Sequence, residues 1–76
     1  MPEDDGFEMI PVESSQIAEV GFNSATGKGR ILFSKNGSLY EYDGCTQEEF
    51  QQIVNAPSVG QEFAALWKPK PYQRLG

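Results

Sequence analysis

The chain has 76 residues, of which 38% are apolar, and its formal net charge at pH 7 is −5. A chain of this length forms one domain with a small core, and this one contains neither an apolar run long enough to span a membrane nor a secretory signal peptide. Its single cysteine cannot form an internal disulfide, which is typical of a reducing compartment. We therefore expect a cytoplasmic protein, located in the bacterial host cytoplasm if its source is viral.

The negative charge is concentrated at the N-terminus. Residues 1–13 contain five acidic and no basic residues, whereas the remainder contains six of each. We expect residues 1–8 to form an acidic flexible tail and residues 9–76 to form a single domain. Because the body of the domain, residues 14–76, is neutral, it attracts a long polyanion poorly, although it can hold one or two phosphates.

The first half of the domain shows the alternation that is typical of strands. Pro11 argues against a central strand before it, and three later stretches alternate, namely 16–23, 28–35 and 38–42. In the first stretch, alternation places Val20 and Ile17 on opposite faces. A cluster of turn residues at 23–27 joins the first two strands. Asn36-Gly37 predicts a type I′ hairpin between the second and third, because both residues tolerate a positive φ.

Two short helices follow. Thr46 and Glu49 have the spacing of a capping box, and Ser58 and Gln61 repeat it at the start of the second helix. Apolar residues recur at helical spacing in both, namely Phe50, Ile53, Val54, Phe63, Leu66 and Trp67. The predicted fold class is therefore α+β, a three-stranded antiparallel sheet with two short C-terminal helices packed on one face.

The order of several motifs resembles a known family. These motifs are residues 11–17, Val20-Gly21-Phe22, Tyr40-Glu41-Tyr42 and residues 56–60. Together they resemble the KTSC domain, a family named for its occurrence at the C-terminus of some lysyl-tRNA synthetases and also found as small free-standing bacterial and phage proteins. The resemblance covers about residues 9–74.

The resemblance implies which residues are central to the family. They are the Tyr-x-Tyr pair, two serines before the first strand, an Ala-x-Ser-x-Gly motif at the second helix and an aromatic–basic end, met here by Tyr40, Tyr42, Ser14, Ser15, Ala56, Ser58, Gly60, Tyr72 and Arg74. The family is similar to proteins suggested to bind RNA. Gln61 and Ala64 stand where members often carry a basic residue and an asparagine, and these departures weaken the expectation of RNA binding.

Nothing in the sequence indicates catalysis. The chain has no histidine, so the usual general base and metal ligand are absent. Cys45 precedes a helix N-terminus, where a thiolate is favoured, but no base partner is visible, and packing explains this cysteine better. We expect a protein without enzymatic activity, catalytic residues, metal or cofactor.

Two segments are candidates for anion contacts. Residues 26–30 contain glycines and bases, but they join two strands, so a hairpin turn explains them unless Lys28 contacts a phosphate. Ser58 and Gly60 lie at a helix N-terminus, whose amides either hold an anion or are capped by Ser58 itself.

Further candidates lie at the two ends of the domain. Ser14 and Ser15 either form a local turn with the backbone or contact a ligand. Tyr72 and Arg74 follow two prolines near the C-terminus. If this segment is fixed, Arg74 can bind a phosphate or carboxylate in a bidentate manner, and otherwise it is a solvated tail.

Tyr40 and Tyr42 point to one face of the third strand, and Glu41 points to the other. If the helices cover the tyrosine face, the rings are core and their hydroxyls need partners. If the helices cover the other face, Glu41 is buried at a cost. We therefore expect the tyrosines to face inward or to line an edge groove, rather than to form an open stacking platform.

The leading hypothesis is a non-enzymatic protein that binds a small, phosphate-bearing nucleotide-type ligand. Tyr40 and Tyr42 would contact it, Ser58 and Gly60 would present amides, and Arg74 or Lys28 would supply charge. By analogy with small viral proteins, a phage-type member would sequester a host nucleotide immune signal. The alternatives are an RNA-binding domain and an acidic protein–protein inhibitor or adaptor. No membrane partner is expected, and self-association into a homo-oligomer is plausible for so small a domain.

Overall fold

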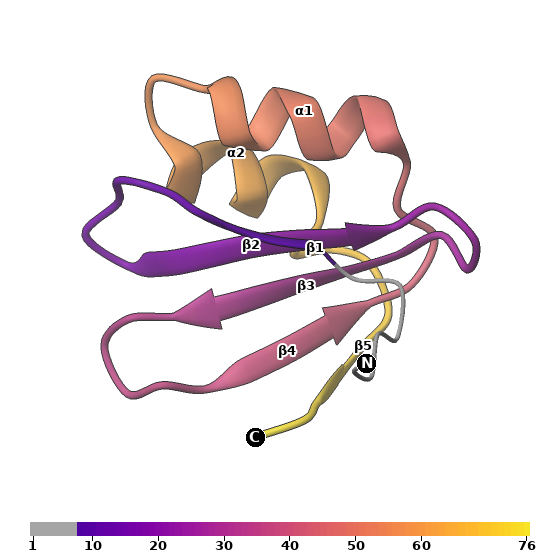
Figure 1. The fold of residues 1–76 in the computed structure, drawn as a ribbon, viewed down its shortest axis with the longest axis horizontal. Coiled ribbons are helices and arrows are strands. Elements are labelled where there is room, and N and C mark those ends of the chain that lie inside the picture. Colours follow the sequence, from indigo (N-terminus) through magenta and orange to yellow (C-terminus); the bar gives the residue numbers. More distant parts are fainter. Residues whose placement is uncertain (1–7) are drawn as a thin grey trace.

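The computed structural model describes residues 8–76, which form one antiparallel sheet and two helices (Figure 1). In chain order the elements are β1 (Glu8–Pro11), β2 (Ile17–Asn23), β3 (Lys28–Phe33), β4 (Leu39–Tyr42), α1 (Gln47–Asn55), α2 (Val59–Leu66) and β5 (Tyr72–Arg74). The strands lie side by side in the order of the sequence, and every neighbouring pair is antiparallel. The predicted α+β class, with two helices packed on an antiparallel sheet, is confirmed, but the sheet has five strands and not three.

The two strands that the sequence patterns missed are the edges of the sheet. β1 has four residues and ends at Pro11, whose missing N–H is tolerated in an edge strand. β5 has three residues, flanked by backbone hydrogen bonds from Asp43 N to Pro71 O (2.9 Å) and from Leu75 N to Leu39 O (2.7 Å). Segments this short contain too few residues for an alternation to be recognised. Both strands form because β2 and β4 offer them a free edge.

Two further expectations concern the acidic N-terminal tail and the lack of a membrane-spanning segment. The predicted acidic tail lies outside the described residues, except for its last residue, Glu8, which begins β1. Neither of the helices found in residues 8–76 combines the length and the apolar character needed to cross a bilayer.

The β3–β4 hairpin forms as predicted, but its turn is longer than the predicted type I′ turn. Phe33 N donates to Ser38 O at 2.9 Å, and Gly37 N donates to Phe33 O at 3.0 Å, which leaves a loop over residues 34–37. Gly37 has a φ of +72°, whereas no non-glycine residue of the described chain has a positive φ. Asn36 instead accepts a hydrogen bond from Ser38 N through its side chain at 3.1 Å. The type I′ prediction is therefore wrong, because that turn needs a positive φ at both central residues.

The two helices begin in different ways. At α1, Thr46 Oγ1 accepts from Glu49 N and Glu49 Oε1 accepts from Thr46 N, both at 3.1 Å, so the predicted capping box is confirmed. Ser58 occupies the N-cap position of α2 but makes no side-chain capping hydrogen bond. The capping box predicted there with Gln61 is therefore wrong, and the first amides of α2 receive no side-chain acceptor from Ser58.

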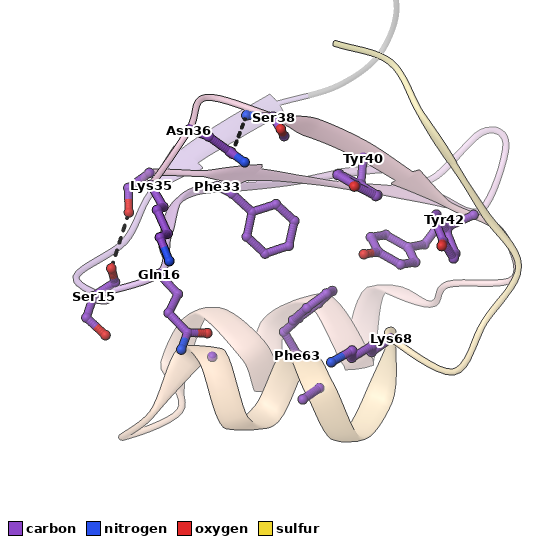
Figure 2. Close-up of a pocket in the computed structure, with 14 residues that line it drawn as sticks. Ser15, Gln16, Phe33, Lys35, Asn36, Ser38, Tyr40, Tyr42, Phe63 and Lys68 are labelled. Carbon is purple, nitrogen blue, oxygen red and sulfur yellow. Dashed lines mark hydrogen bonds between the residues drawn. The ribbon is translucent and has the colours of Figure 1, made fainter.

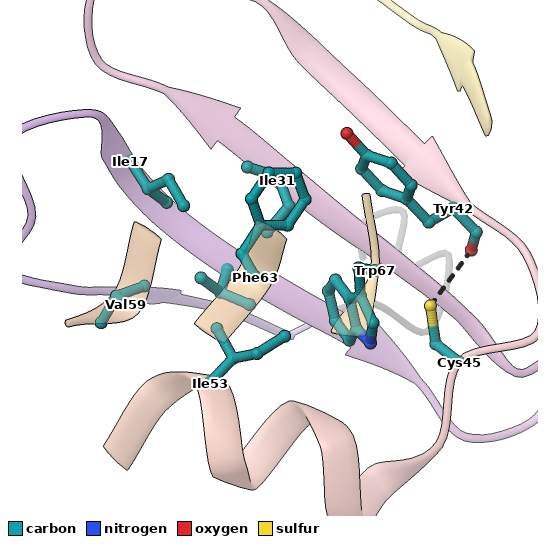
Figure 3. Close-up of a cluster of buried hydrophobic side chains, with 9 residues drawn as sticks. Ile17, Ile31, Tyr42, Cys45, Ile53, Val59, Phe63 and Trp67 are labelled. Atoms are coloured by element: carbon teal, nitrogen blue, oxygen red, sulfur yellow. Dashed lines mark hydrogen bonds between the residues drawn. The ribbon is translucent and has the colours of Figure 1, made fainter. Parts of the chain in front are cut away.

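The core lies between the helices and the sheet face that they cover (Figure 3). Its buried members are Ile17, Val20, Ile31, Tyr42, Cys45, Ile53, Val59, Phe63 and Trp67. Trp67 has no exposed surface, and its ring lies against Gly29 of β3, where a Cβ would overlap the indole. The sheet therefore admits the largest core side chain at a position that has no side chain of its own.

The start of β2 departs from strict alternation. Alternation places Ile17 on the face opposite to Val20, yet both are buried, with exposed fractions of 1% and 0%. The register of β2 with β3 shifts between Ile17 and Glu19, which marks a β-bulge. Because the bulge adds one residue to β2, it turns both isoleucine and valine side chains toward the helices. The predicted face of Ile17 is therefore wrong.

Candidate functional site

A groove of about 910 Å³ opens between the tyrosine face of the sheet and α2 (Figure 2). Its walls come from the segment before β2, the β3–β4 hairpin, α2 and β5, and they are formed by Ser15, Gln16, Phe33, Ser34, Lys35, Asn36, Ser38, Tyr40, Tyr42, Gly60, Phe63, Ala64, Lys68 and Tyr72. We call this site the aromatic groove. Its volume lies in the range of small-molecule sites in proteins.

Aromatic rings from four elements meet in the aromatic groove. Tyr42 is the central ring, with its centroid 5.3 Å from that of Phe63 and 5.7 Å from that of Tyr72. Tyr40 lies 5.5 Å from both Phe33 and Tyr72. These spacings are those of packed aromatic pairs. The cluster therefore gives the groove an apolar wall that is itself held in place by ring contacts.

The tyrosines reach this wall because side chains alternate along β4. Tyr40 and Tyr42 both point to the face that the helices cover (Figure 2). Tyr42 is 4% exposed, Tyr40 is half-buried, and Tyr72 on the neighbouring strand is 60% exposed. The three rings therefore form a gradient from the core to the rim of the groove, which is the edge-groove arrangement that the sequence led us to expect.

The hydroxyl groups of these tyrosines find no hydrogen-bond partner within residues 8–76. Burial, together with the neighbouring Tyr40 and Tyr72, raises the pKa of Tyr42 to about 12. The Tyr42 hydroxyl therefore keeps its proton at neutral pH and is available both to donate and to accept.

The aromatic groove is basic although the chain as a whole is acidic. Among residues 8–76, two lysines and no acidic residue line it. Lys35 lies at the Gln16 end of the groove and Lys68 on the side of Phe63 (Figure 2). Neither lysine forms an ion pair with another residue of the described chain. The groove therefore favours an anionic ligand.

A second hollow of about 510 Å³ lies at the N-terminus of α2 and shares Ser15, Gln16, Gly60 and Ala64 with the aromatic groove. Ser58 also lines it. A Cβ at Gly60 would make only ordinary contacts, 3.6 Å from Gln16 Oε1. The two hollows therefore adjoin each other, and the second one, which Glu13 also lines, lies beside the first amides of α2.

The paired serines have different surroundings. Ser14 Oγ accepts hydrogen bonds from Gln16 N (3.2 Å) and Ile17 N (3.3 Å), which is the local turn considered for it. Ser15 is exposed and lines both hollows, and its carbonyl oxygen accepts from Ser34 Oγ at 3.4 Å. Ser14 therefore stabilises the local turn before β2, and Ser15 offers its polar groups to both hollows.

Two of the candidate basic residues lie away from the aromatic groove. Lys28 lies on the opposite face of the sheet, with Nζ 3.4 Å from Asp43 Oδ1 and 3.7 Å from Glu41 Oε1. Arg74 is exposed, and its Nε donates to Gly76 O at 3.1 Å. Neither lines the groove, so neither supplies the charge there.

Glu41 is buried, with 7% of its surface exposed, although the helices cover the other face of the sheet. Its carboxylate accepts hydrogen bonds from Arg30 Nε (3.0 Å) and Gln73 Nε2 (3.4 Å), and Lys28 lies nearby. Glu41 is therefore buried on the face that the helices leave open, a case that the two alternatives drawn from the sequence did not include. Long polar side chains of the neighbouring strands cover it and offset the cost of its desolvation.

Cys45 belongs to the core and not to the surface of the groove. Burial raises the pKa of the Cys45 thiol to about 11, and its Sγ donates to Tyr42 O at 3.5 Å. This thiol is a protonated core group at neutral pH. Within residues 8–76, no group of three His, Cys, Asp or Glu side chains is placed to hold a metal ion.

Sequence reasoning missed several residues of the aromatic groove. Phe33 and Ser38 share the sheet face of the tyrosines, and following the alternation from Tyr42 and Tyr40 to Ser38, the first residue of the predicted third strand, would have found Ser38. Lys35 and Lys68 gave no such signal. They lie 33 positions apart in the sequence and are brought to one groove by the hairpin turn and the end of α2.

A family model described as the KTSC domain matches residues 13–72. The chain belongs to the KTSC domain family. The crystal structure of a KTSC domain protein from Yersinia pestis has a TM-score of 0.84 to this chain at 27% sequence identity, and the match covers 92% of this chain and 99% of that one. An uncharacterized protein of Stutzerimonas stutzeri (strain A1501) is 28% identical over 64 residues, which is 84% of this chain and 89% of that protein. The resemblance inferred from the motifs is confirmed.

Proposed function

We propose that this KTSC domain binds a small, phosphate-bearing nucleotide-type ligand in the aromatic groove, without acting on it chemically. The observation that carries the proposal is that residues 8–76 line one groove with packed aromatic rings and with lysines that have no ion-pair partner among them, and place no acidic residue there. A planar base suits the rings, and a phosphate suits the lysines. A protein that binds without catalysis would act by sequestering its ligand.

Each segment of the ligand would contact different residues of the groove. Tyr40, with Tyr72 at the rim, would contact the base. Lys35 and Lys68 would supply the positive charge for the phosphate. Lys28 and Arg74, the candidates from the sequence, lie outside the groove. A second phosphate would reach the free amides at the start of α2 through the hollow that adjoins the groove.

The test is isothermal titration calorimetry of the whole protein with the four ribonucleoside 5′-monophosphates, their 5′-diphosphates and cyclic AMP and GMP. Native mass spectrometry of protein purified from cell extract would detect a ligand that co-purifies. We expect at least one nucleotide to bind. We also expect a Lys35→Ala/Lys68→Ala double variant to lose roughly tenfold in affinity, because two exposed charge contacts are together worth about 1–2 kcal/mol.

The matched control is Lys28→Ala, which removes one positive charge from the opposite face of the sheet and should leave nucleotide affinity within about twofold. A ligand-free protein that binds no nucleotide of this panel contradicts the proposal. Equal losses in Lys28→Ala and in the groove variants would mean that the groove is not the binding site.

A further inference from the structure

Ser38, directly before β4, and two tyrosines of β4 form a row of three hydroxyl-bearing side chains in the lining of the aromatic groove. Ser38, Tyr40 and Tyr42 alternate along the chain, so all three side chains lie on the face that the helices cover, and all three line the groove (Figure 2). We call these three side chains the hydroxyl row. It consists of every second residue of one short segment.

The hydroxyl row has no hydrogen-bond partner in residues 8–76, although most of the surface of Ser38 and Tyr42 is buried. Ser38 and Tyr42 are each only 4% exposed, and none of the three hydroxyls has a hydrogen-bond partner in the described part of the chain. Ser34 lines the same groove, but its Oγ donates to Ser15 O at 3.4 Å. Among residues 8–76, the buried side-chain polar atom without a partner is Trp67 Nε1 in the core, so the hydroxyls of the row keep contact with solvent. Because their residues line the groove, these hydroxyls are open to a ligand that enters it.

We infer that the hydroxyl row determines the specificity of the aromatic groove, by taking a ligand whose planar ring carries hydrogen-bonding groups along its edge. The inference rests on the proposed function and adds to it the recognition of the base. Phe33 and Phe63 provide apolar contact for any flat ring, and this contact cannot distinguish one ring from another. A hydroxyl both donates and accepts, so Ser38 and Tyr42 each complete a hydrogen bond with a polar ring edge. A ring without polar groups leaves both unpaired.

The experiment compares the same nucleotide panel with phenyl phosphate, which has a planar ring and a phosphate but no polar ring edge. We expect the best nucleotide to bind at least tenfold more tightly than phenyl phosphate to the unmodified protein. Ser38→Ala and Tyr42→Phe should each weaken that nucleotide about tenfold, the usual effect of one lost hydrogen bond, and should leave phenyl phosphate within about twofold.

Two controls separate recognition from structure. Ser34→Ala makes the same chemical change at a groove hydroxyl that already has a protein partner, and it should not alter the ratio between nucleotide and phenyl phosphate. The melting temperatures of ligand-free Ser38→Ala and Tyr42→Phe should not fall, because neither hydroxyl bonds another residue of the chain.

The outcomes distinguish the inference from the proposed function. If phenyl phosphate binds as tightly as the nucleotides, or if both hydroxyl variants bind the nucleotide like the unmodified protein, the inference is overturned while the groove remains a phosphate-ligand site. If neither the panel nor phenyl phosphate binds, the proposed function is overturned and the inference falls with it.

Discussion

At the scale of single residues, Gly29 is the position on which the core depends most directly. It pairs with Phe22 on one side and with Tyr42 on the other, so it lies in the middle of the helix-facing side of the sheet. The indole of Trp67 fills the space above it, and Trp67 is fully buried. In the sequence Gly29 belongs to a segment that suggests a turn or a phosphate contact. Its role in the structure is to leave room for a ring.

Gly29→Ala should therefore destabilise the protein by about 1–3 kcal/mol, because the new methyl group overlaps Trp67 and forces the core to shift. Urea unfolding followed by tryptophan fluorescence would measure the change. Gly60→Ala is the matched control. Gly60 lies in α2, and its new methyl group would make only ordinary van der Waals contacts, with the side chains of Gln16 and Ser14. Stability should therefore be unchanged or higher by up to about 1 kcal/mol. A Gly29→Ala variant as stable as Gly60→Ala would refute the close packing of Trp67 on the sheet.

At the scale of elements, the two helices differ in whether a side chain caps their first amides. α1 begins with a complete capping box, in which Thr46 and Glu49 satisfy each other's backbone amides. α2 begins at the hollow beside the groove, and Ser58 leaves its first amides without a side-chain acceptor. The first helix start stabilises the fold, and the second remains available to an anion.

Thr46→Ala should cost about 1 kcal/mol of stability, the usual value of an N-cap hydrogen bond. Ser58→Ala should cost almost nothing, since no capping bond is lost. Chemical denaturation of both variants tests this difference. Equal destabilisation by the two substitutions would show that Ser58 caps α2 in solution and that its amides are not free.

At the scale of the whole molecule, the charges on the sequence and in the groove have opposite signs. The chain carries −5, yet the described part of the chain lines the aromatic groove with two lysines and no acidic residue. Such a distribution suits a small anion that enters one basic groove better than a long polyanion that needs an extended basic face. RNA binding and an adaptor role for the acidic N-terminus remain predictions, and a steep fall of affinity with salt would favour RNA.

The stability of the whole molecule should fall at alkaline pH. Burial raises the pKa of Cys45 from 9.0 to about 11 and that of Tyr42 from 10.0 to about 12. Both groups therefore lose their protons more readily in the unfolded chain, so folding is favoured below pH 9 and that advantage is lost progressively between about pH 9 and 12. Tyr42→Phe should flatten the upper part of this fall in equilibrium unfolding experiments. A pH dependence unchanged by Tyr42→Phe would contradict the assignment.

The sequence by itself determined the features that depend on neighbouring residues. Alternation identified the three inner strands and put Tyr40 and Tyr42 on one face. Helical spacing and the Thr46–Glu49 pair identified both helices and the start of the first. The order of motifs identified the KTSC family. These signals are readable because side-chain period and capping are set within a few residues of the chain.

Only the tertiary structure decided the features that depend on which distant segments meet. It added the edge strands, it turned Ile17 into the core through a bulge, and it left Ser58 without a capping bond. It also removed Lys28 from the candidate site and brought Lys35 and Lys68 into one groove. No local pattern encodes these outcomes. They follow from the packing of the two helices on the sheet. That packing places α2 opposite the strand face of Tyr40 and Tyr42, so this face becomes the wall of a groove.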